Sequence, residues 1–101
     1  MRGENAMSNE IGYYGNAWMM FMEAHHPELV QQMQKEGTYE DVARSVNRSA
    51  CDHYSLLFKQ YAQQDPPPDG SEAYQSWKYT CDYYINSIVM REQVLVAVTR
   101  A

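Results

Sequence analysis

The segment from Thr38 to Gln64 constrains the fold more than any other part of the chain. Its apolar residues recur every three or four positions, which is the spacing of one face of an α-helix. These residues are Tyr39, Val42, Val46, Ala50, Tyr54, Leu57 and Tyr61. Gly37 and Thr38 suit the end of the preceding segment and an N-cap, and the prolines after Asp65 cannot continue a helix. We therefore predict a helix about 40 Å long, whose apolar face other segments must cover.

A break and a second long helix follow this segment. The stretch Asp65-Pro66-Pro67-Pro68-Asp69-Gly70 predicts the tip of a helical hairpin. Asp69, with Glu72 three residues later, resembles a capping box at a helix start. A stripe of apolar residues then predicts a helix that reaches the C-terminus, at Ala73, Trp77, Cys81, Tyr84, Ile88, Leu95 and Val98. The β-branched run 94–98 also suits a strand, but no partner strand is evident, so a helix is predicted there too.

Folding the two long helices back at about residue 67 pairs apolar positions along the hairpin. Phe58 is then expected to face Trp77, and Cys51 to face Cys81. By the same rule Tyr54 is placed near Thr80 and Tyr84, and Val46 near Ile88.

Two shorter helices are predicted before the long hairpin. Asn16 is a candidate cap for a helix that turns Ala17, Trp18, Phe21 and Met22 to one side. The His26-Pro27 step interrupts it, and Pro27 suits the first turn of a second helix that ends near Glu36, before Gly37. Two short N-terminal helices packed on a long antiparallel helical hairpin give an all-α, four-helix fold. We expect residues 1–10 to be a flexible N-terminus and residues 11–101 to form a single helical domain.

Charge and composition limit the function and the location. Thirteen acidic residues against eight basic ones give a net charge of -5. We therefore do not expect the chain to bind nucleic acid directly, because such binding depends on clustered Lys and Arg. The first ten residues, MRGENAMSNE, contain no apolar core of a secretory signal, and no run is long enough to span a membrane. We therefore expect a cytoplasmic protein without a membrane partner.

Several short motifs resemble a known family. They are Ile11-Gly12-x-Tyr14-Gly15, Met22 and Glu23 running into His26-Pro27, then Gly37, and later Trp77 followed by Ile85-Asn86. From Ile11 to about Leu95 the chain resembles the TnpV family of small transposon-encoded proteins. The resemblance implies a helical fold and carriage on a bacterial mobile element, and it implies no particular biochemical activity. The chain departs from the family pattern at its proline-rich tip and at Tyr83-Tyr84.

No constellation in the sequence predicts catalysis, a cofactor or a metal site. There is no phosphate-binding glycine loop, Cys-x-x-Cys or His-Glu-x-x-His motif. Cys51 and His53 are two residues apart on a helix and point in different directions, so zinc is the least favoured interpretation. Cys51 and Cys81 are expected to be free, buried thiols, with a disulfide as the alternative. The His25-His26 pair is interpreted as a solvated pair near a helix C-terminus.

Tyrosine and charge give the candidate binding residues. Nine tyrosines exceed what a core of this size can hide, so we expect a partner-binding or self-association surface at Tyr13, Tyr14, Tyr79 and Tyr83. Acidic residues expected to contribute are Asp65, Asp69 and Glu72 at the tip, and Asp82. Arg44, Arg48 and Arg91 could instead form a small basic patch.

These features predict a non-enzymatic protein-binding module, with homodimerisation as one outcome. Two mechanisms are open: inhibition of a host defence nuclease by an acidic surface that imitates nucleic acid, or accessory binding to a recombinase of the element. The alternative from another class is a DNA-binding accessory protein that uses the arginine patch.

Overall fold

The computed structural model describes residues 11–100, and these residues form an all-α structure, as the sequence predicts. The helices are α1 (Tyr13–His25), α2 (Pro27–Glu36), α3 (Tyr39–Gln64) and α4 (Ser71–Val89). A π-helical turn, η2 (Met90–Val94), continues α4 without a gap. The expected flexible segment 1–10 lies outside the described residues. No strand is present between residues 11 and 100.

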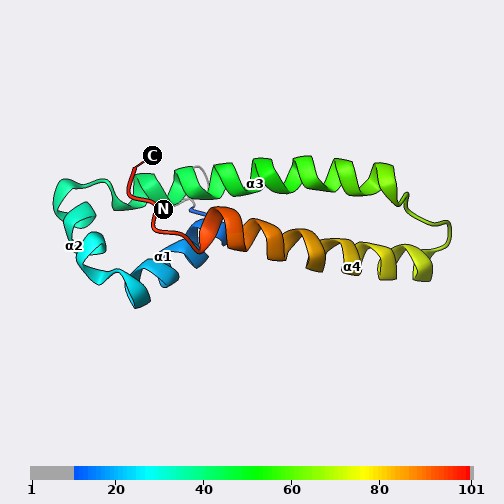
Figure 1. The fold of residues 1–101 in the computed structure, drawn as a ribbon, viewed down its shortest axis with the longest axis horizontal. Helices are drawn as coiled ribbons and strands as arrows, with labels where there is room; N and C mark the ends of the chain where they lie inside the picture. The colour runs from blue at the N-terminus through cyan, green and yellow to red at the C-terminus, as the bar shows by residue number, and fades with distance from the viewer. Residues whose placement is uncertain (1–10, 101) are drawn as a thin grey trace, which may run out of the picture.

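The long helices α3 and α4 run antiparallel, and the proline segment connects them at one end of the molecule (Figure 1). The expected contact between Phe58 and Trp77 is confirmed, because their ring centroids lie 5.8 Å apart in an edge-on arrangement. The Trp77 indole N–H also donates a hydrogen bond of 2.8 Å to the carbonyl of Asp65, which ties α4 to the end of α3. The rings of Tyr61 and Tyr84 also meet across the hairpin, with 6.0 Å between their centroids.

At the other end, α1 packs against α3 and against η2, the turn that continues α4 (Figure 1). Trp18 and Met22 of α1 are completely buried, together with Val42 and Ala43 of α3. From α4 and η2 the core receives Cys81, Ile85, Val89 and Val94. The core therefore lies where α1, α3 and α4 meet, and the hairpin extends beyond it toward its tip.

The predicted break between α1 and α2 is confirmed at His26 and Pro27. The predicted stop at Gly37 is also confirmed. Gly37 has a φ of 75°, in the left-handed region that glycine adopts without strain, and its N–H bonds the carbonyl of Gln34 at 3.2 Å. α3 begins directly after Thr38, but the Thr38 hydroxyl does not cap it and lies 3.4 Å from the carbonyl of Met33.

Two other predicted caps are wrong. α1 begins at Tyr13 rather than after Asn16, with Gly12 at the N-cap position. α4 begins after Gly70, which has a φ of 95°, and no side chain of the expected Asp69–Glu72 capping box bonds its first turn. In both places a glycine with positive φ makes the turn into the helix, and the predicted polar residue does not serve as the cap.

The predicted continuation of the second long helix to the C-terminus is also wrong. The helical backbone ends at Val94, and Leu95 has a ψ of 54°, outside the helical range. Val94, Val96 and Val98 are β-branched and lose side-chain freedom in a helix, so they support its continuation poorly. The buried stripe of α4 is also shifted, because Ile85 and Val89 are buried while Tyr84 is exposed.

Candidate interaction surface

The buried stripe of α4 determines which tyrosines face outward. Trp77, Cys81 and Ile85 are buried at four-residue intervals, so Tyr79 and Tyr83, also four residues apart, lie on another face of the same helix. Their exposed fractions are 73% and 74%, and that of Tyr13 at the start of α1 is 67%. The sequence-based expectation that these three tyrosines face outward is confirmed.

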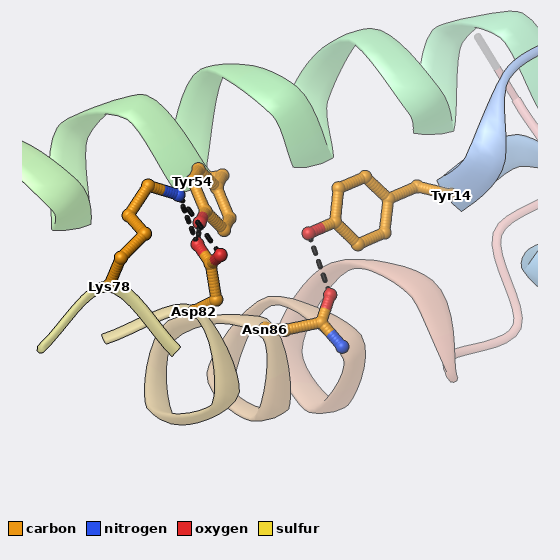
Figure 2. Close-up of polar contacts among 5 residues, drawn as sticks. All are labelled: Tyr14, Tyr54, Lys78, Asp82 and Asn86. Carbon is orange, nitrogen blue, oxygen red and sulfur yellow. Dashed lines mark hydrogen bonds and ion pairs between the residues drawn. The ribbon is translucent and has the colours of Figure 1, made fainter. Parts of the chain in front are cut away.

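Residues of α1, α3 and α4 line a common groove of about 400 Å³, which we call the tyrosine groove. Its lining residues are Tyr13, Tyr54, Lys78, Tyr79, Asp82, Tyr83 and Asn86. Four of the seven are tyrosines, so aromatic rings dominate the surface that a ligand would meet. Figure 2 shows the polar contacts made by Tyr54, Lys78, Asp82 and Asn86 of this groove.

An ion pair and a tyrosine hydroxyl meet in the groove (Figure 2). The Lys78 ammonium lies 2.9 and 3.0 Å from the two carboxylate oxygens of Asp82, one helical turn further along α4. The Tyr54 hydroxyl of α3 donates a hydrogen bond to the same carboxylate. Lys78 also lies 5.3 Å from the centre of the Phe58 ring, within the range of a cation–π contact. Asp82 is therefore neutralised by its own chain, and the expectation that it serves as a free acid for a partner is not supported.

Tyr14 is buried, so its expected place on the exposed surface is wrong. Its hydroxyl donates a hydrogen bond of 2.8 Å to the side-chain oxygen of Asn86, which joins α1 to α4 (Figure 2). Burial is the main cause that raises the pKa of Tyr14 to about 12, with smaller contributions from Cys51, Tyr13 and Asp82. Tyr14 is thus a structural residue beneath the groove.

A second hollow of about 350 Å³ adjoins the tyrosine groove and shares Tyr54 with it. Its other lining residues are Tyr14, Cys51 and Ser55, and we call it the side hollow. Cys51 is exposed and Cys81 is buried, and both are free thiols. The expectation of two buried thiols therefore fails for Cys51, which is exposed and lines the side hollow.

The hairpin tip carries three exposed acidic residues, Asp65, Asp69 and Glu72, which we call the acidic tip. No Lys or Arg occurs between Lys59 and Lys78, so no base close in sequence neutralises them. The tip lies at the end of the molecule opposite α2 (Figure 1). The tyrosine groove and the acidic tip are thus two separate surfaces.

The three arginines of the expected basic patch differ in their surroundings. Arg44 lies 3.1 Å from Asp41 and 3.3 Å from Glu40, so two carboxylates neutralise it. Arg91 lies 3.8 Å from Glu92, and Arg48 is exposed. These ion pairs weaken the field that a DNA backbone would meet at this patch.

The remaining candidate ligands do not gather into a site. Among residues 11–100, no group of three or more His, Cys, Asp or Glu side chains could hold a metal ion. His25 and His26 both lie close to the Phe21 ring, with centroid distances of 5.0 and 5.6 Å. His53 lies 3.2 Å from the amide nitrogen of Gln93, a contact between α3 and η2. Over the same residues, no helix is long and apolar enough to cross a membrane.

Sequence reasoning missed Tyr54, Lys78 and Asn86 as lining residues of the groove. The four-residue spacing of Lys78 and Asp82 was an available signal for an ion pair on one helix face. Tyr54 and Asn86 gave no such signal, since their roles depend on how α1, α3 and α4 pack together.

No family model, curated protein or solved structure matches the chain.

Proposed function

We propose that this protein is a non-enzymatic module that binds another protein through the tyrosine groove. One observation carries the proposal: Tyr13, Tyr79 and Tyr83 are highly exposed and line one groove, although they come from two different helices. Exposed tyrosines supply a large contact area with few rotatable bonds, and aromatic residues are enriched at protein interfaces. Our proposal takes two short helices packed on a long antiparallel hairpin as the functional arrangement, since Tyr13 of α1 then lines the same groove as the tyrosines of α4.

We infer that the partner is a nucleic-acid-processing protein, either a host defence nuclease or the recombinase of a mobile element that carries this gene. The net charge of -5 and the exposed acidic tip support this inference. Carboxylates presented at one end of a helical hairpin can occupy a basic surface that normally holds nucleic acid phosphates. In the inhibitor version, the acidic tip enters the nucleic-acid site while the tyrosine groove anchors the complex.

We also place the protein in the cytoplasm. Cys51 is an exposed thiol without a disulfide partner, which suits a reducing compartment.

An affinity capture with matched variants tests the binding surface. The tagged chain is incubated with extract of the source bacterium, and the wild type is compared with Tyr79→Ser/Tyr83→Ser and with Asp69→Lys/Glu72→Lys. Loss of the captured protein in the first variant is the expected result. Tyr74→Ser is the control, because Tyr74 is an exposed tyrosine of α4 that does not line the groove. Capture that survives the double tyrosine substitution would overturn the groove as the binding surface.

A gel shift tests the DNA-binding alternative. The wild type is expected to form no salt-dependent complex with duplex DNA at low ionic strength, because the arginines are largely paired with acids. A complex that disappears in high salt and in Arg44→Glu/Arg48→Glu would show that direct DNA binding is the function instead.

A further inference from the structure

The residues that line the tyrosine groove carry no net charge, although the chain as a whole is strongly acidic. Among the residues that line the groove and the side hollow, only Lys78 and Asp82 are charged, and they neutralise each other at 2.9 Å. Two copies that meet through the same face present identical charges to each other. A lining with net charge would therefore repel its copy, whereas this neutral lining adds no repulsion of its own to that between the acidic chains.

The chemistry of the groove is also complementary to itself. A tyrosine hydroxyl both donates and accepts hydrogen bonds, and its ring packs on another ring, so one tyrosine surface can pair with an identical one. The side-chain oxygen of Asn86 already accepts the Tyr14 hydroxyl, while its amide group offers two further donors at the groove.

The exposed area indicates how strong such a pairing can be. A tyrosine buries about 150–250 Å² when fully covered, so three side chains exposed by 67%, 73% and 74% offer roughly 300–500 Å². A standard interface needs about 800 Å² from each partner. The three tyrosines supply about half of this area, and the other lining residues add to it, which places the interface at the small end of the range.

We propose that the tyrosine groove pairs with the tyrosine groove of a second copy of this chain, which gives a symmetric, weakly held dimer. This inference rests on the proposed function, because it names an occupant for the same surface. In the dimer the tyrosines are covered. Dissociation frees the groove for the other protein, and the acidic tip lies outside the paired surface throughout.

Sedimentation velocity of the full chain from about 1 µM to about 500 µM tests the pairing. The expected result is a reversible, concentration-dependent shift from monomer to dimer. Tyr79→Ser/Tyr83→Ser is expected to raise the dissociation constant by about tenfold or more, because it removes most of the shared aromatic surface. Tyr74→Ser, outside the groove, should leave the dissociation constant unchanged.

Charge variants test the requirement for a neutral face. Asp82→Asn leaves Lys78 unpaired on both copies, so dimerisation should weaken, and high salt should restore part of it by screening the repulsion. Exchanging the pair, Lys78→Asp with Asp82→Lys, keeps the face neutral and should keep the dimer. Circular dichroism of each variant confirms that the helices are intact.

Two outcomes would overturn the dimer. One is a wild type that stays monomeric over the whole concentration range, and the other is a dimer that Tyr79→Ser/Tyr83→Ser leaves unchanged. A monomeric wild type that captures a bacterial protein through the groove would remove the dimer and leave the proposed function standing. If the wild type dimerises and Tyr79→Ser/Tyr83→Ser weakens the dimer but still captures that protein, the proposed function is removed and the dimer stands.

Discussion

The side-chain oxygen of Asn47 lies 3.0 Å from the backbone nitrogen of Tyr14, so a residue of α3 caps the first turn of α1. The same oxygen accepts a second hydrogen bond, of 3.2 Å, from the backbone N–H of Gly15. The first N–H groups of a helix have no partner within the helix, and no residue of α1 supplies a side-chain cap. The contact of α1 with α3 therefore also supplies hydrogen-bond acceptors for two backbone N–H groups in the first turn of α1.

Replacement of Asn47 by alanine is expected to destabilise the fold. Asn47→Ala removes both acceptor contacts and leaves two backbone donors at the α1–α3 contact unsatisfied, which should cost about 1–2 kcal/mol of unfolding free energy. Asn47→Asp is the matched control, because its carboxylate can accept the same bonds and suits a helix N-terminus. Urea denaturation followed by circular dichroism measures both. Equal stability of Asn47→Ala and the wild type would show that water satisfies these groups just as well.

Glycine at position 15 is expected to be required for the close approach of α1 to α3. A Cβ atom added there would lie 2.7 Å from the backbone carbonyl oxygen of Ala43, which cannot move like the end of a flexible side chain. Gly15→Ala should therefore destabilise the protein by about 1–3 kcal/mol in urea or thermal denaturation, although alanine favours helix.

The variant Gly37→Ala is the control that distinguishes the steric clash expected in Gly15→Ala from backbone strain. Gly37 has a φ of 75°, but nothing lies within 4 Å of an added Cβ, so only the left-handed backbone is unfavourable, by about 1–2 kcal/mol. Rotation of α1 away from α3 in Gly15→Ala, seen as exposure of the buried Trp18 in its fluorescence, would support the steric explanation. A fully stable Gly15→Ala would contradict it.

The sequence predicted the helices well because their signals are local. The apolar periodicity of α3, the His26-Pro27 break and the stop at Gly37 each depend on neighbouring residues, and each agrees with the structure. The predicted contact of Phe58 with Trp77 also holds, since a short tip fixes the register close to it.

Features that depend on how the helices pack together could not be predicted from local sequence patterns. The cap of α1 comes from Asn47, which is more than thirty positions away in the chain, and no local pattern reveals it. Tyr13 and Tyr14 are adjacent and chemically identical, yet one is exposed and the other is buried. Only the packing of α1 against α3 and α4 decides which of them lines the groove and which supports it.

The two cysteines are expected to react at very different rates with a thiol reagent such as Ellman's reagent. Cys51 is exposed and should react at once in the folded protein, whereas Cys81 is buried and should react only when the fold opens. Burial also raises the pKa of the Cys81 thiol, which lowers the fraction of reactive thiolate. The expected result is one fast and one slow thiol. Cys51→Ser should remove the fast phase alone, and two fast thiols in the wild type would contradict the buried position of Cys81.

Stability is expected to fall at alkaline pH because of Tyr14. Burial raises its pKa from 10.0 to about 12, so between these values the unfolded chain loses the phenolic proton while the folded protein keeps it. The contribution of this proton is therefore complete below pH 10 and is lost as the pH rises toward about 12. Tyr39, whose pKa is also raised by burial and by its bond to Glu23, acts in the same direction.

The variant Tyr14→Phe tests this coupling. It removes the hydrogen bond to Asn86, so it should be less stable than the wild type by about 1 kcal/mol near neutral pH. Because it lacks the titrating group, its stability should then fall less steeply than that of the wild type when urea midpoints are compared from about pH 8 to about pH 11. Tyr79→Phe, at an exposed position, is the control, and its stability should change with pH as that of the wild type does. If the stabilities of Tyr14→Phe and the wild type fall in parallel as the pH rises, ionisation of Tyr14 is not coupled to folding.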